Sequence, residues 1–85
     1  MMVLVHFDWA GTQEELEKYT AAVKKAYDST PGTKFLGRLI PWNKKYHYTH
    51  FMEVKDLPTM QEAGRKVDYK RDYKVMTHGE YDIFS

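Results

Sequence analysis

The chain has 85 residues, which allows one domain over residues 1–85 with a small hydrophobic core. Thirteen basic and twelve acidic residues give a formal net charge of +1, so no overall field favours nucleic acid or anionic membranes. Cysteine is absent, which excludes disulfides and thiolate chemistry.

The first 40 residues predict a strand, a helix and a second strand. Residues 2–9 alternate in polarity as a strand does, with Val3, Val5 and Phe7 on one face. The sequence from Thr12 to Glu15 has the form of a capping box, which predicts a helix start. The apolar stripe of this helix would consist of Leu16, Tyr19, Val23, Ala26 and Tyr27. Turn residues 28–32 end it, and residues 34–40 form the second strand.

Residues 45–55 are rich in aromatic and β-branched residues and contain no Gly or Pro, which predicts a central strand. Residues 41–44 form a short loop before it. The second and third strands should therefore make an antiparallel hairpin.

The last third predicts a second helix and a fourth strand. Asp56 is placed to cap the helix, and Pro58 lies in its first turn, where a missing N–H costs little. The pattern leaves its end open within residues 68–73, and residues 75–84 read as the last strand. The expected buried stripe of the helix is Leu57, Met60, Ala63, Gly64 and Val67.

This order of elements predicts an α+β fold, the ferredoxin-like βαββαβ sandwich, with a four-stranded antiparallel sheet and two helices on one face. The spatial order of strands would be last, first, third, second. The helix-facing set would include Val3, Val5, Phe7, Phe35, Gly37, Leu39, Thr49, Phe51, Thr77, Gly79, Tyr81 and Ile83. The other face would be of mixed polarity, with Leu4, His6, Asp8, Leu36, Arg38, Ile40, Tyr48, His50, Met52, Met76, His78 and Glu80.

Strand register then suggests a candidate site on that second face. Neighbouring strands lie about 4.8 Å apart, so His6, His50 and His78 would form one row across the sheet, with Arg38 beside His50. His47 has the opposite parity and is expected to be exposed. The row would be flanked by Asp8, Tyr48 and Glu80.

The chain resembles the dimeric α/β-barrel superfamily, in which two ferredoxin-like subunits pack sheet against sheet around a pocket. The resemblance depends on element order, length, the segments 33–38 and 51–54, and the Asp56-Leu57 pair before a helix. It is closest to the small uncharacterised members. The superfamily also includes cofactor-free monooxygenases, haem-degrading enzymes, isomerases and polyketide cyclases. The resemblance implies a homodimer that binds a small organic molecule.

In that pocket His6, His50 and His78 are candidates for proton transfer, since histidine titrates near neutral pH. Arg38 and Tyr48 would hold the substrate, and Asp8 or Glu80 would orient a ring. We therefore expect a small-molecule-binding protein, with cofactor-free isomerase, cyclase or monooxygenase activity as the enzymatic version.

Three alternatives remain open. The sheet face could serve only for dimerisation. His6, His50 and His78, or two of them with Asp8 or Glu80, could bind zinc or iron, but these three histidines lack the local spacing of a metal motif, so we expect no metal or other cofactor. Tyr46 and Tyr48 near basic residues suggest RNA stacking, but the third strand lacks the matching signature. The apolar start, residues 1–5, is too short for a signal peptide or a membrane span, so we expect a cytoplasmic protein without nucleic-acid or membrane partners.

Overall fold

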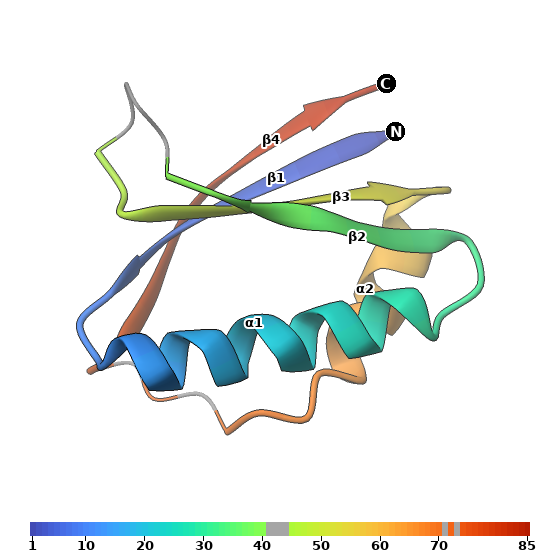
Figure 1. Cartoon of the computed structure of the whole chain (residues 1–85). Coiled ribbons are helices and arrows are strands. Elements are labelled where there is room, and N and C mark those ends of the chain that lie inside the picture. Colours follow the sequence, from blue (N-terminus) through green and yellow to red (C-terminus); the bar gives the residue numbers. More distant parts are fainter. Residues whose placement is uncertain (41–44, 71, 73) are drawn as a thin grey trace.

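The computed structural model describes residues 1–40, 45–70, 72 and 74–85. It has four strands and two helices in these ranges (Figure 1). In chain order they are β1 (Met2–Trp9), α1 (Gln13–Asp28), β2 (Thr33–Leu39), β3 (Tyr48–Val54), α2 (Leu57–Arg65) and β4 (Met76–Phe84).

The strands form one antiparallel sheet in the order β2-β3-β1-β4, as the sequence predicts. Both helices lie on one side of the sheet, and the segment after α2 runs past α1 before it enters β4 (Figure 1). The two ends of the chain lie side by side, because Met2 pairs with Phe84. This is the ferredoxin-like α+β fold.

Both helices begin at the predicted caps. The Thr12 hydroxyl accepts a hydrogen bond from the Glu15 backbone N–H at 3.1 Å, which satisfies one of the unpaired donors of the first turn of α1. The Asp56 carboxylate accepts from the Thr59 N–H at 2.8 Å, and a proline lies in the first turn of α2. Local sequence therefore positions both helices against the sheet.

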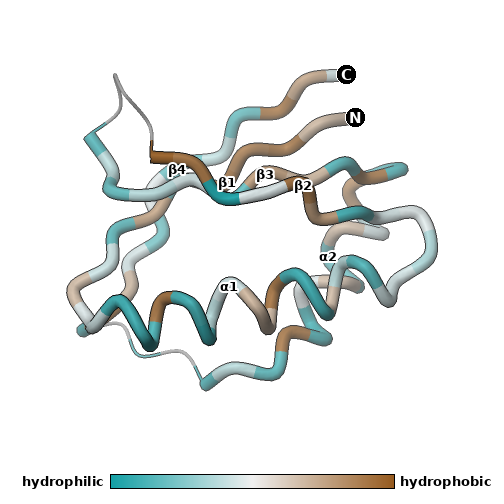
Figure 2. Tube along the Cα trace, viewed as in Figure 1, coloured by the Kyte–Doolittle hydropathy of each residue, from teal (hydrophilic) through white to brown (hydrophobic). Residues whose placement is uncertain are grey.

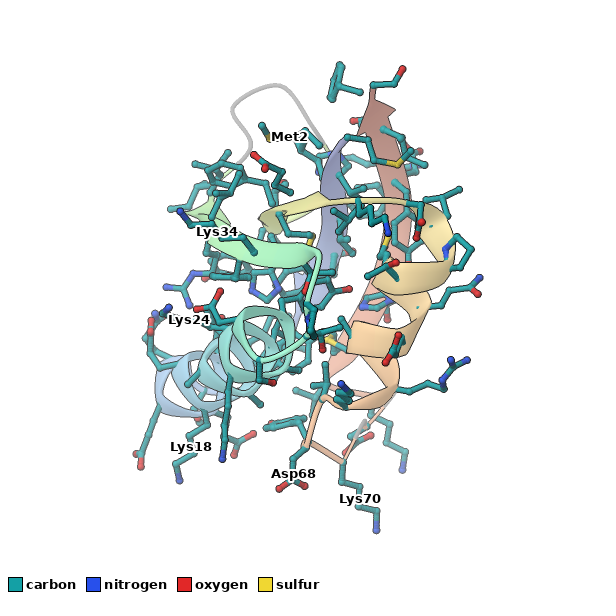
Figure 3. All side chains as sticks on the ribbon, turned by 90° about the vertical axis from the view of Figure 1, so that its right-hand side faces the viewer. Met2, Lys18, Lys24, Lys34, Asp68 and Lys70 are labelled. Atoms are coloured by element: carbon teal, nitrogen blue, oxygen red, sulfur yellow. The ribbon has the colours of Figure 1, made fainter. Side chains whose placement is uncertain are left out.

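The core lies between the helices and the sheet. The predicted stripe of α1 is buried in full, from Leu16 to Tyr27. It packs on apolar side chains of the two central strands, and Figure 2 shows hydrophobic segments along β1 and alternating polarity along α1. The labelled Lys18, Asp68 and Lys70 point away from the sheet (Figure 3). The buried strand residues are Val3, Val5, Phe7, Trp9, Phe35, Met52, Val54 and Met76.

Some predicted element boundaries differ from the structure. The third strand begins at Tyr48, three residues later than predicted. The predicted loop 41–44 lies outside the described residues, as do Arg71 and Tyr73. The second helix ends at Arg65, and residues 68–70 form no regular element.

The predicted stripe of α2 is only partly correct. Ala63 is buried, and Met60 and Val67 pack against the core, but Val67 lies beyond the helix end. Leu57 is 42% exposed, and Gly64 is exposed. A helix of nine residues at the margin of the sheet has room for few inward positions.

The predicted division of the sheet into two faces is wrong for β3. His50 pairs with Val5, and Tyr48 pairs with Phe7. Residues directly opposite in antiparallel strands share a face, so the even-numbered residues of β3 face the helices and Thr49 and Phe51 face away.

In each of the two edge strands, β2 and β4, a β-bulge changes which residues face the helices. The β2 register shifts between Phe35 and Gly37, so that Arg38 faces the helices opposite His50. In β4 the shift lies at Gly79: His78 pairs with Phe7 and Glu80 with His6. An extra residue in one strand reverses the parity of everything beyond it. Consequently Gly37, Leu39 and Thr77 lie on the outer face, and Met76 and His78 face the helices.

None of the helices in the described part of the chain combines the length and the apolar character needed to cross a bilayer.

Candidate functional site: a cavity between the sheet and the helices

The structure divides the three predicted histidines between the two faces of the sheet. His50 and His78 face the helices, on the strands that flank β1. His6 faces the other way, since it pairs with Thr49 and Glu80. The predicted row of three imidazoles is therefore wrong, whereas the predicted neighbourhood of Arg38 and His50 is correct. Two features account for the error: β3 is shifted by one residue relative to the expected register, and the bulge at Gly79 turns His78 to the helix-facing side.

A cavity of about 310 Å³ lies between the sheet and the helices, and His50 and His78 form part of its wall. Its apolar wall includes Val5, Val23 and three methionines. The cavity comes within the size range of small-molecule sites. Among the described residues, its polar wall consists of His50, His78, Gln61, Tyr19, Tyr27, Tyr69 and Tyr81.

His50 is held tightly in this wall. Its ring packs against Phe7, Phe35 and Tyr19, with centroid distances of 4.7, 5.3 and 5.5 Å. Its Nε2 atom lies 3.0 Å from the Thr20 hydroxyl of α1. The imidazole is 2% exposed. Strand pairing and the helix together fix its orientation.

The environment of His50 keeps its imidazole neutral. Burial, and to a smaller extent the positive charge of Arg38 and the nearby His78, together lower the pKa of His50 to about 3. Burial also raises the pKa of the Tyr27 phenol to about 12, with a smaller contribution from Tyr81. Both groups are therefore uncharged hydrogen-bonding groups near neutral pH.

Arg38 does not point into the cavity. Its guanidinium donates to Glu17 at 2.6 Å and to the Thr20 hydroxyl at 3.2 Å, and it lies over the Tyr48 ring, 5.5 Å from the centroid. Tyr48 itself packs on Phe7. Arg38 therefore lies next to His50, and neither of these two predicted substrate-holding residues is in the cavity wall.

His6 belongs to a separate polar cluster on the outer face. Its Nδ1 lies 2.6 Å from the Thr49 hydroxyl, and its Nε2 lies 2.7 Å from an Asp82 carboxylate oxygen. Tyr46 stacks over the imidazole, with ring planes 11° apart, and His6 is only 1% exposed. These contacts satisfy both ring nitrogens, so the cluster stabilises the outer face.

The remaining predicted site residues lie at the outer face and its margin. Asp8 accepts a hydrogen bond from the His47 backbone N–H at 3.1 Å. Glu80 is exposed and lies 3.8 Å from the Lys45 ammonium. His47 is exposed, as predicted. Neither carboxylate approaches His50 or His78 through a strand pair.

The positions of the histidines and tyrosines also bear on two alternatives, metal binding and RNA stacking. His6 cannot share a metal ion with His50 and His78, because the sheet separates them. Within residues 1–40, 45–70, 72 and 74–85, no three His, Asp or Glu side chains gather as a group that could hold an ion. Tyr46 lies over the outer face and Tyr48 faces the helices, so the two rings do not form one stacking surface.

Sequence reasoning missed four groups of the site: Thr20, Tyr69 and the two tyrosines Tyr19 and Tyr27, which it assigned only to the core. One feature of the sequence does indicate which way His50 faces. The set containing His50 also contains Met52 and Val54, whereas the alternative set contains Glu53. The more apolar set of a strand faces the core, so His50 belonged with the helices.

A scan against protein-family models and searches of curated proteins and of solved structures found no match to this chain.

Proposed function

We propose that this chain binds a small, uncharged and largely apolar organic molecule in the cavity between the sheet and the helices. The observation that carries the proposal is the cavity itself, about 310 Å³ in volume and walled, in the described part of the chain, by apolar side chains together with two histidines, four tyrosines and a glutamine. Sites of this composition bind small molecules by burying apolar surface and orient them with few polar contacts.

The composition of the wall supports a ligand without formal charge. No Asp, Glu, Lys or Arg is among the described residues of the wall. The low pKa of His50 means that its imidazole does not supply a positive charge near neutral pH. A carboxylate or ammonium group would therefore lose its hydration without gaining a counter-ion.

The same geometry separates the roles of the two cavity histidines. A histidine with a pKa of about 3 is a weak base near neutral pH, so His50 suits hydrogen bonding to a ligand. His78 is the second histidine of the same wall and is less buried than His50. In a cofactor-free isomerase, cyclase or monooxygenase built on this cavity, we assign proton transfer to His78.

A substitution at Gly64 tests the cavity. A Cβ added there would meet only the Tyr27 hydroxyl, at 3.9 Å, so a longer side chain extends into open space in the cavity wall. We expect Gly64→Leu to weaken binding of 2-isopropylnaphthalene by about tenfold or more, because it fills the site. Gly64→Ala is the matched control: it should bind normally and gain roughly 0.5–1 kcal/mol of stability from helix propensity.

Methionine methyl NMR provides the readout. Met52, Met60 and Met76 line the cavity, whereas Met2 lies on the outer face. We expect 2-isopropylnaphthalene to shift the three cavity methyl signals and to leave Met2 unchanged. 2-Naphthoate should shift none of them. Shifts confined to Met2, or equal binding by Gly64→Leu and Gly64→Ala, would contradict the proposal.

The proposal includes a homodimer of the kind found in the dimeric α/β-barrel superfamily. The outer face exposes Leu39 and Phe84, and Leu4 and Phe51 beside them are partly exposed. Apolar side chains exposed beside the polar cluster of this face favour a protein partner. A second copy suits it because a two-fold axis lets the same patch cover itself.

Two exposed leucines give a matched test of the dimer. Leu39 on the outer face is 46% exposed, and Leu57 on α2 is 42% exposed. We expect sedimentation to show a dimer for the unchanged chain, and Leu39→Gln to weaken it by about tenfold or more. Leu57→Gln should leave it intact. A monomer at all concentrations, or equal effects of both substitutions, would remove the dimer from the proposal.

A further inference from the structure

We propose that His50 presents its Nδ1–H group to the cavity as a hydrogen-bond donor, so that the bound molecule carries a carbonyl oxygen. This inference rests on the proposed function and deepens it, since it names the chemical class of the ligand. It follows from a chain of side-chain hydrogen bonds that begins at the surface of α1 and ends at the cavity.

The chain of hydrogen bonds fixes which ring nitrogen carries the proton. Arg38 has only donors; it donates to Glu17 at 2.6 Å and to the Thr20 hydroxyl oxygen at 3.2 Å. Within the described residues, His50 Nε2, at 3.0 Å, is the other partner of that hydroxyl. The Thr20 hydrogen therefore points to Nε2, which accepts it. The neutral imidazole must then carry its own proton on Nδ1.

The Nδ1–H group needs an acceptor. His50 is 2% exposed and lines the cavity, and no group among the described residues forms a hydrogen bond with its Nδ1. When an apolar ligand displaces water from the cavity, a donor at its wall is left without a hydrogen bond, which is costly. A ligand that brings an acceptor to this point therefore binds more tightly than one of the same shape without it.

A neutral carbonyl compound fits this requirement best. A carbonyl oxygen only accepts, whereas a hydroxyl brings a donor that needs an acceptor of its own. A carboxylate would bring a charge that no Arg or Lys in the described wall compensates. The successive donors from Arg38 through Thr20 to His50 point the same way, so each polarises the next toward the carbonyl oxygen. Arg38 and Thr20 act through His50 and are positioning residues.

Two probes of the same shape test the inference. 2-Acetylnaphthalene has a carbonyl oxygen where 2-isopropylnaphthalene has a methyl group. We expect the unchanged protein to bind the ketone about tenfold more tightly, because only the ketone pairs with the buried donor. Thr20→Val should abolish this preference, since Val cannot donate to Nε2. Thr20→Ser keeps the hydroxyl and should restore the preference.

A second measurement needs no variant. Long-range ¹H–¹⁵N correlation spectra of the unliganded protein should show His50 as the neutral tautomer protonated on Nδ1. Protonation on Nε2 would overturn the inference. Equal affinity for the two probes would overturn it and leave the binding site in place. Failure of both probes to bind would remove the proposed function itself.

Discussion

The unchanged protein should lose about 2 kcal/mol more stability than His50→Gln when the pH falls from 8 to 5. The folded pKa of His50 is about 3, below its ordinary value of 6.5. As the pH falls, His50 is therefore protonated in the unfolded chain before it is protonated in the folded protein. The contribution of the neutral imidazole is fully present above pH 6.5, and it decreases as the pH falls toward 3. Urea unfolding at both pH values measures the difference.

The range from pH 8 to 5 separates the titration of His50 from that of the acidic side chains. The pKa values of Glu17, Asp28 and Asp56 are lowered by hydrogen bonds to Arg38, Lys24 and Thr59, so these groups stay ionised down to pH 5. The control His47→Gln removes an exposed imidazole and retains the full contribution of His50. If His50→Gln does not fold, the ring signals of His50 in the unchanged protein should not titrate between pH 8 and 5. A midpoint near pH 6.5 would contradict a buried, neutral His50.

Phe7→Ala should cost about 3–5 kcal/mol, the usual range for removing a buried aromatic side chain. Phe7 is fully buried at the centre of the sheet. Its ring contacts His50, Tyr19 and His78, with centroid distances of 4.7, 5.9 and 6.5 Å. A chain of this length has a total stability on the order of 4–13 kcal/mol, so much of the variant should be unfolded at 37 °C.

Phe7→Leu is the control for Phe7→Ala. It keeps most of the apolar volume and should cost about 1–2 kcal/mol. Thermal unfolding followed by circular dichroism compares the two variants. Near-equal melting temperatures for Phe7→Ala and the unchanged protein would show that Phe7 does not hold the cavity wall in place.

Local sequence signals predict most of this fold. The capping residues Thr12 and Asp56 begin helices where expected, and β1 covers the predicted residues 2–9. The order of strands follows from these elements and the handedness of their connections. These features depend on interactions within a few residues, which the sequence displays directly.

The candidate site was harder to predict because it depends on register between strands. Alternation around β3 separates His47 from His50, and the only indication in the sequence of which one faces the helices is that Met52 and Val54 belong to the set of His50. Two bulges, next to Gly37 and Gly79, also change parity within β2 and β4. Glycine in a strand is typical of bulges, yet only the paired strand shows where the extra residue lies. The predicted partnership of Arg38 and His50 was correct, although the prediction had both on the outer face.

A structure of the protein with 2-acetylnaphthalene bound tests the central claim most directly. The proposal predicts the naphthalene ring between the sheet and the two helices, among Met52, Met60 and Met76, with its carbonyl oxygen at hydrogen-bond distance from Nδ1 of His50. A probe seated on the outer face, near Leu4 and Phe51, or a cavity closed by its own side chains, would contradict it.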